Sequence, residues 1–198
     1  MAAAAYYVLR DTALGELWIA LVKGTAVGCL AGYAFFRFHT RDARWMSLIL
    51  ALGALGDMVI IFWFEAGGAI FFASHIVAIF FFRRFPRAKT TGSQRILALS
   101  LLILTPLISG WLASSVLACV YGLGLGSMAA IIWLSRFPRY RVGAGAILFV
   151  VSDFLIFAGL GPLEWENLAY WLVWPVYYWG QFLICTGVIQ QLRREHRA

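Results

Sequence analysis

Residues 45–64 read WMSLILALGALGDMVIIFWF, a run of twenty residues in which Asp57 is the only charged side chain. Residues 142–161, VGAGAILFVVSDFLIFAGLG, have the same length and also a single charge, Asp153. A helix needs about 20 apolar residues to cross a bilayer. Each run therefore predicts a membrane-spanning helix with one carboxyl group inside it. Because an unpaired carboxylate at that depth is costly, such acids mark proton, ion or substrate sites.

The composition of the whole chain agrees with these two runs. Of its 198 residues, 63% are hydrophobic and 13% are charged, which excludes an ordinary soluble domain. We expect one transmembrane helical domain over residues 1–198. The start, MAAAAYYVLRD, lacks the basic and long apolar regions of a cleaved signal peptide. The three cysteines stand apart in apolar runs and indicate neither a disulfide framework nor a metal cluster.

The apolar runs predict an all-α polytopic bundle with seven spans. Fourteen of the sixteen Lys and Arg residues lie in alternate connecting segments and in the C-terminal tail. The positive-inside rule places these segments in the cytoplasm, with the N-terminus outside and the C-terminus cytoplasmic. The acidic residues Asp11, Glu16, Glu65, Glu164 and Glu166 fall on the opposite side. The expected spans are 14–36, 43–64, 67–84, 94–112, 114–135, 142–161 and 167–190.

The distribution of charge also predicts the partners of the chain. A net charge of +7 would suggest nucleic acid in a soluble protein. Here the basic segments set the topology and are expected to contact anionic membrane lipids, so no nucleic acid is expected. The expected location is the inner (cytoplasmic) membrane of a bacterium.

Other polar side chains are expected at the depth of the two acids. Counting about 1.5 Å of rise per residue from the outer end of each span places six residues of six helices at roughly 10–15 Å. Gln181 falls at roughly 20 Å, and Tyr178 shares an aromatic helix face with it. This layer predicts one buried cavity that opens toward the outer leaflet. The six residues are Lys23, Asp57, His75, Tyr121, Asp153 and Tyr177.

The charges in this layer predict different roles for the two acids. Lys23 can neutralise one aspartate, while a desolvated His75 stays neutral. The other aspartate is then expected to hold its proton near neutral pH, which gives a carboxylate and a carboxylic acid in one site. Plainer interpretations stay open, because Lys23 can snorkel to the surface, His75 can be a packed core residue and either acid can be structural.

The sequence indicates neither a metal nor another cofactor. His39 and His196 lie in expected cytoplasmic segments, so only one histidine is left inside the membrane and a three-histidine zinc centre cannot form. The glycines at 122, 124 and 126 resemble a nucleotide-binding loop only superficially, because no strand precedes them. Close packing of helices is their expected use.

In order and spacing, these residues resemble the YhhN-like lysoplasmalogenase family of integral membrane hydrolases. That family has an early lysine, a Gly-Asp pair, an aromatic residue before a histidine, a tyrosine before Met-Ala, a Gly-Ala…Phe…Ser-Asp segment and a final Tyr…Gln. The matching residues here are Lys23, Gly56-Asp57, Phe72 with His75, Tyr121 with Met128-Ala129, Gly145-Ala146 with Phe149 and Ser152-Asp153, and Tyr178 with Gln181.

The chain also departs from the family pattern. Gly24 replaces a proline after the lysine, and Ala78 stands where an aromatic residue is usual. The family commonly has eight spans, and the resemblance implies that the first of them is missing here. A shorter build of this kind can accompany a change of substrate.

The resemblance implies hydrolysis of the vinyl ether bond of lysoplasmalogens to a fatty aldehyde and glycerophosphoethanolamine or glycerophosphocholine. Protonation of the β-carbon would give an oxocarbenium ion, to which water adds. Asp57 and Asp153 would be the catalytic pair, in either order. Lys23 would hold the ionised acid or the substrate phosphate. The remaining residues of the layer, His75, Tyr121, Tyr177, Tyr178 and Gln181, would bind the lysophospholipid and orient water.

Three other classes of protein stay open. Buried acids also relay protons in proton-coupled transporters, although inverted repeats and interrupted helices are not evident here. A retinal-binding protein would need a lysine late in the chain, and the last four expected spans contain none. A lipid-binding protein without catalysis is the third. Head-group preference, chain length and oligomeric state are left open by the sequence.

Overall fold

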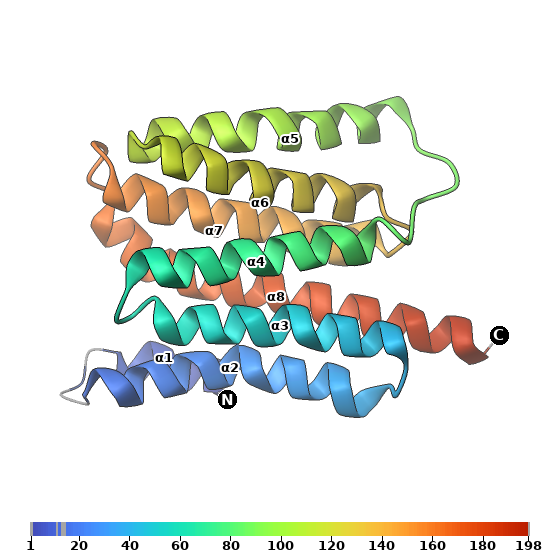
Figure 1. Cartoon of the computed structure of the whole chain (residues 1–198), viewed down its shortest axis with the longest axis horizontal. Coiled ribbons are helices and arrows are strands. Elements are labelled where there is room, and N and C mark those ends of the chain that lie inside the picture. Colours follow the sequence, from blue (N-terminus) through green and yellow to red (C-terminus); the bar gives the residue numbers. More distant parts are fainter. Residues whose placement is uncertain (1, 11, 13–14, 198) are drawn as a thin grey trace.

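The computed structural model describes residues 2–10, 12 and 15–197, and over these residues the chain is helical with short connections (Figure 1). The all-α architecture expected from the sequence is confirmed there. Asp11 and residue 14, the expected start of the first span, lie outside the described residues. The elements are α1 Ala2–Leu9, α2 Glu16–Arg37, α3 Arg41–Val59, α4 Phe64–Phe82, α5 Gly92–Ala113, α6 Val116–Leu134, a π-helical turn Arg139–Gly143, α7 Ala144–Leu160 and α8 Glu166–Arg197.

Six of these helices form a closed ring. α2 packs on α3, α3 on α4, α4 on α6, α6 on α7, α7 on α8, and α8 returns to α2 and α3. α5 lies outside the ring against α6 and α7, and α1 lies against α2 and α8. The long helices run side by side, so the α3–α4, α5–α6 and α7–α8 connections meet at one end (Figure 1). We call this end, with residues 59–64, 113–116 and 160–166, the open end, and the opposite end the closed end.

The length and composition of the helices define an integral membrane protein. Six are long and apolar enough to cross a bilayer: α2, α4, α5, α6, α7 together with its π-helical turn, and α8. α3 is not among them. It has 19 residues and belongs to the same ring, but it includes Arg41, Asp42, Arg44 and Asp57.

The expected span 43–64 ends earlier than the apolar run suggests. α3 stops at Val59 and α4 begins at Phe64, so the connection is itself apolar. Gly67 allows this tight return, because a Cβ added there would lie 2.5 Å from the Cα atom of Ile60. Hydropathy does not detect a turn built from apolar residues. Asp57 therefore lies two residues from the end of α3 and not in the middle of a span.

Both chain ends are more helical than expected. The span expected at 167–190 continues as helix to Arg197, and near its end Gln191 Nε2 donates to Glu195 Oε1 at 3.0 Å. At the other end, the segment before the first expected span forms the short helix α1. With 8 residues, α1 is too short to cross a bilayer.

An aromatic cluster fills the closed end. It consists of Phe81, Phe82, Phe85 and Phe137, whose ring centroids lie 5.0–6.3 Å apart and whose side chains are at most 7% exposed. The backbone closes around it, since Arg136 N–H donates to the Phe85 carbonyl at 2.9 Å. The α4–α5 and α6–α7 connections are thereby joined to each other at this end.

Candidate active site

A cavity of about 1070 Å³ occupies the open half of the ring. All eight helices contribute to its wall, which is mostly apolar. The charged residues of the wall are Arg10, Lys23, Asp57, Glu65, Asp153 and Glu166. Both acids from the long apolar runs therefore face one cavity, as the sequence predicts.

Asp57 is held by a lysine and a tyrosine. Its Oδ1 atom lies 3.4 Å from Lys23 Nζ, and its Oδ2 atom accepts a hydrogen bond of 2.8 Å from the Tyr177 hydroxyl. Asp57 is 1% exposed. The lysine ammonium lies 5.8 Å from the ring centroids of both Tyr6 and Trp174, so it stays inside the bundle. The charge of this acid is thus balanced by a neighbouring cation.

A glycine brings α8 close to α3 beneath Asp57. Gly53 lies one helical turn before Asp57, and a Cβ added there would meet Gln181 Nε2 at 3.5 Å and Tyr177 Oη at 3.6 Å. Gln181 is buried and lies below the cavity wall. α8 thus packs closely against α3 here, and the Tyr177 hydroxyl reaches the carboxyl group.

Asp153 has hydroxyl partners in place of a cation. The Tyr121 hydroxyl donates to its Oδ2 atom at 2.9 Å, and Ser152 Oγ lies 3.3 Å from its Oδ1 atom. His75 Nε2 lies 3.1 Å from the same tyrosine oxygen and is 1% exposed. The ion pairs found among the described residues do not include Asp153. One buried acid is therefore paired with a positive charge and the other is not.

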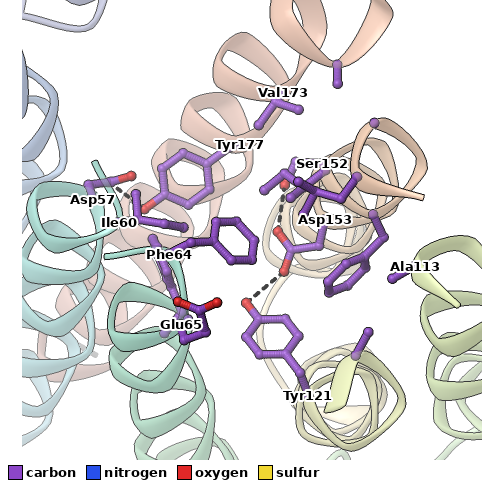
Figure 2. Close-up of a pocket in the computed structure, with 18 of the residues that line it drawn as sticks. Asp57, Ile60, Phe64, Glu65, Ala113, Tyr121, Ser152, Asp153, Val173 and Tyr177 are labelled. Carbon is purple, nitrogen blue, oxygen red and sulfur yellow. Dashed lines mark hydrogen bonds between the residues drawn. The ribbon is translucent and has the colours of Figure 1, made fainter. Parts of the chain in front are cut away.

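The two carboxyl groups face the cavity from different sides. Figure 2 shows Asp57 with Tyr177 on one side and Asp153 with Tyr121 on the other. No hydrogen bond joins the two carboxyl groups in the described part of the chain. The wall residue Phe71 lies on the Asp57 side, with its ring centroid 5.9 Å from that of Tyr177. The acids thus share a chamber without direct contact.

The residues expected in the polar layer divide into three groups. Lys23, Asp57, Tyr121, Asp153 and Tyr177, from five helices, line the cavity. His75 and Gln181 are buried directly behind this wall, next to the two tyrosines. Tyr178 is half-buried outside the wall, with its ring 6.1 Å from that of Trp174.

Glu65, Tyr6 and Arg10 are among the wall residues that were not expected in the site from the sequence. Glu65, on the first turn of α4, lines the cavity near Tyr121 in the view of Figure 2. Tyr6 and Arg10 come from the N-terminal segment. The sequence does show a pair of tyrosines followed by an arginine just before the first span. This short pattern has no helical periodicity, so it does not indicate that the residues face the cavity.

Hydrogen bonds to the backbone of α8 hold the N-terminal segment in place. Trp174 Nε1 donates to the Ala3 carbonyl at 2.9 Å. In the other direction, Arg10 Nη1 donates to the Tyr170 carbonyl at 2.5 Å and the Tyr7 hydroxyl to the Trp171 carbonyl at 3.3 Å. α1 therefore closes the side of the cavity that contains the lysine of the ion pair.

The fold and the cavity define a class: a helical membrane protein with two buried acids, one of them paired with a lysine, in a chamber at one end of the bundle. Residues 18–188 match the YhhN family, and the chain belongs to that family, which confirms the resemblance. Both acids and all their partners lie inside the matched range, whereas α1 lies before it. No curated protein and no solved structure matches the chain.

Proposed function

We propose that this protein is a membrane hydrolase that cleaves the vinyl ether bond of lysoplasmalogens to a fatty aldehyde and glycerophosphoethanolamine or glycerophosphocholine. The observation that carries the proposal is the unequal pairing of two buried acids in one cavity. Vinyl ether hydrolysis needs a proton donor and a base at once. Membership of the YhhN family supports the proposal.

The pairing assigns a role to each acid. Asp57 lies next to Lys23, which favours the carboxylate form, so it is the base. Asp153 is buried and forms no ion pair within the described part of the chain, which favours the protonated acid. A hydroxyl can both donate and accept. When Asp153 holds its proton it can donate to Tyr121, and Tyr121 can then donate to His75 Nε2.

The reaction adds one water across the bond in balanced steps. Asp153 transfers its proton to the β-carbon of the vinyl ether, and the C=C electron pair forms the new C–H bond, which leaves an oxocarbenium ion. Water attacks the cationic carbon and gives a proton to Asp57. The resulting hemiacetal loses its hydroxyl proton to the Asp153 carboxylate, while Asp57 protonates the departing glycerol oxygen. Both acids regain their starting states.

The other polar residues position these groups. Lys23 keeps Asp57 ionised and stabilises it electrostatically. Tyr121 and Tyr177 each orient one carboxyl group, and His75 and Gln181 support the two tyrosines from behind. Tyr178, which lies outside the wall, takes no direct part in this scheme.

We also propose a placement in the membrane, with residues 1–198 forming one domain. α3 is the seventh span, because it belongs to the ring of spanning helices. The closed end and the C-terminus, which contain most Lys and Arg, face the cytoplasm of a bacterial cell. The N-terminus and the cavity mouth then face outward.

Membrane-impermeant labelling of single cysteines at Ser114 and at Ser93 tests this orientation. Reaction at Ser93 but not at Ser114 in intact cells would show the opposite orientation.

An aldehyde assay tests the activity. Purified protein in detergent should release aldehyde from a 1-alkenyl lysophospholipid and none from its 1-alkyl analogue, which has no double bond to protonate. Asp57→Asn and Asp153→Asn should each lower the rate by about 10²- to 10⁴-fold, the usual contribution of an acid or base. Asp42→Asn, an aspartate at the closed end, is the matched control and should keep the rate.

Two results would end the proposal. One is wild-type rates of aldehyde release in both acid variants. The other is proton-coupled solute flux in liposomes without any hydrolysis, which would make the buried acids a transport relay.

A further inference from the structure

Several cavity-lining residues also lie on the outer surface of the bundle. On α6, Leu117 and Val120 belong to the cavity wall and are 68% and 51% exposed. On α4, Ala69 lines the cavity and is exposed too. A residue that faces a cavity and the exterior at once lies on the border of an opening. The cavity therefore opens sideways between α4 and α6, as well as at the open end.

The packing of α4 and α6 limits this opening to one level. Deeper in the bundle the two helices touch, because Gly124 of α6 leaves room for the ring of Phe72, which a Cβ there would meet at 2.5 Å. One turn nearer the open end, the wall residue Gly68 is free of neighbours, and a Cβ added there would meet nothing within 4 Å. The helices thus separate above Phe72 and leave a gap. We call the gap lined by Gly68, Ala69, Leu117 and Val120 the α4–α6 portal.

The chemistry of the portal differs from that of the open end. All four of its residues are apolar, and the surface around it continues with exposed apolar side chains such as Leu123. In a membrane-spanning bundle such a surface faces hydrocarbon. By contrast, the charged wall residues Arg10, Lys23 and Glu166 lie on the N-terminal segment, α2 and α8, and Glu65 lies on the first turn of α4, between the portal and the open end. A molecule with a polar head and one hydrocarbon chain matches this division.

We propose that the α4–α6 portal holds the hydrocarbon chain of a single-chain phospholipid, which enters sideways from the bilayer while the head group stays in the polar part of the cavity. The identity of the lipid rests on the proposed function. Just inside the portal lie Phe72 and Tyr121, with ring centroids 6.4 Å apart, and the Tyr121 hydroxyl bonds Asp153. The first carbons of the chain, next to the glycerol oxygen, therefore come to lie beside the acid that donates the proton.

Photo-crosslinking in nanodiscs tests the route without any need for turnover. The probe is a 1-O-alkyl lysophosphatidylcholine, which has no vinyl ether, with a diazirine midway along its chain. Crosslinks that an excess of the unlabelled lipid removes should map to peptides of α4 and α6. Gly68→Trp should weaken this labelling by roughly tenfold, because the indole would occupy the space of the hydrocarbon chain.

Gly28→Trp is the matched control. Gly28 is another intramembrane glycine, on α2, where an added Cβ meets nothing within 4 Å, and it does not line the cavity. This variant should label like the wild type. Crosslinks confined to α1 and α8, or equal labelling of both variants, would overturn the portal.

The two proposals fail separately. Portal labelling without release of aldehyde from the alkenyl lipid would refute the proposed hydrolase activity and support the proposed binding site for the hydrocarbon chain. A wild-type rate of hydrolysis in Gly68→Trp, with crosslinks outside α4 and α6, would refute the portal and leave the proposed hydrolase activity supported.

Discussion

The two ends of the bundle are built from the same helices and differ in how the space between them is filled. At the closed end, α4, the connection that follows it and the segment after α6 contribute the four phenylalanines of the aromatic cluster, which are buried against one another. At the open end, α4 contributes Gly68, Ala69 and Phe72 to the wall of a cavity of about 1070 Å³. The buried cluster at one end therefore supports a hollow site at the other, where missing contacts cost stability.

The largest effect on stability is expected from the closed end. Phe137 is 1% exposed and contacts the other three rings of the cluster. Phe137→Ala should lower the free energy of unfolding by about 3–5 kcal/mol, as is typical for a buried aromatic residue. Thermal unfolding in detergent measures this, with Phe62→Ala in the exposed α3–α4 connection as control. Equal unfolding temperatures for the two variants would contradict the role given to the aromatic cluster.

A large effect on activity is expected from Lys23→Met at the open end. Without its cation Asp57 takes up a proton and stops acting as a base, so the rate of aldehyde release should fall roughly 10- to 100-fold. Lys23→Arg keeps the charge and should recover part of the rate. A wild-type rate in Lys23→Met would show that the ion pair plays no part in the reaction.

Tyr121→Phe tests whether a hydroxyl in the cavity wall contributes more to the rate than a hydroxyl outside the wall. The variant removes the hydroxyl that joins Asp153 to His75, and a lost hydrogen bond to a charged or reacting group should reduce the rate by about tenfold or more. Tyr178→Phe removes a hydroxyl that lies outside the wall and should leave the rate unchanged. Aldehyde release at saturating lipid measures both, and equal rates would contradict the assignment.

The smallest effect is expected from the surface of the closed end. Arg84 pairs with Asp42 at 2.5 Å, and the two side chains are 42% and 28% exposed. Arg84→Gln should change the free energy of unfolding by less than about 1 kcal/mol, because water screens such pairs. A loss similar to that of Phe137→Ala would mean that this ion pair, and not the aromatic cluster, holds the closed end together.

The sequence predicted the parts of the site that depend on rare residues and fixed helix geometry. Charges are so uncommon in apolar runs that Lys23, Asp57 and Asp153 stood out, and the constant rise per residue placed them at one depth. Tyr177 and Tyr178 could not be separated in this way. Neighbours on a helix point about 100° apart, so both fitted a broad aromatic face, and only packing decides which one reaches the cavity.

Other features have no sequence pattern that distinguishes them. The α3–α4 connection has the same apolar composition as the helices it joins, so its turn was hidden inside a predicted span. α1 is too short for a periodic signal. The N-terminal segment is held in place by hydrogen bonds to the backbone carbonyl groups of Tyr170 and Trp171, and any residue at those two positions would offer the same carbonyl group. The gap between α4 and α6 results from packing between distant segments and leaves no local signal.

Gly145 of α7 and Gly180 of α8 meet backbone to backbone. A Cβ added to either one would lie 2.7–2.8 Å from the carbonyl oxygen of the other. No side chain separates the two helices at this point, so they cannot slide or part without losing the contact. α7 and α8 therefore behave as one rigid unit that carries Asp153 and Tyr177 together.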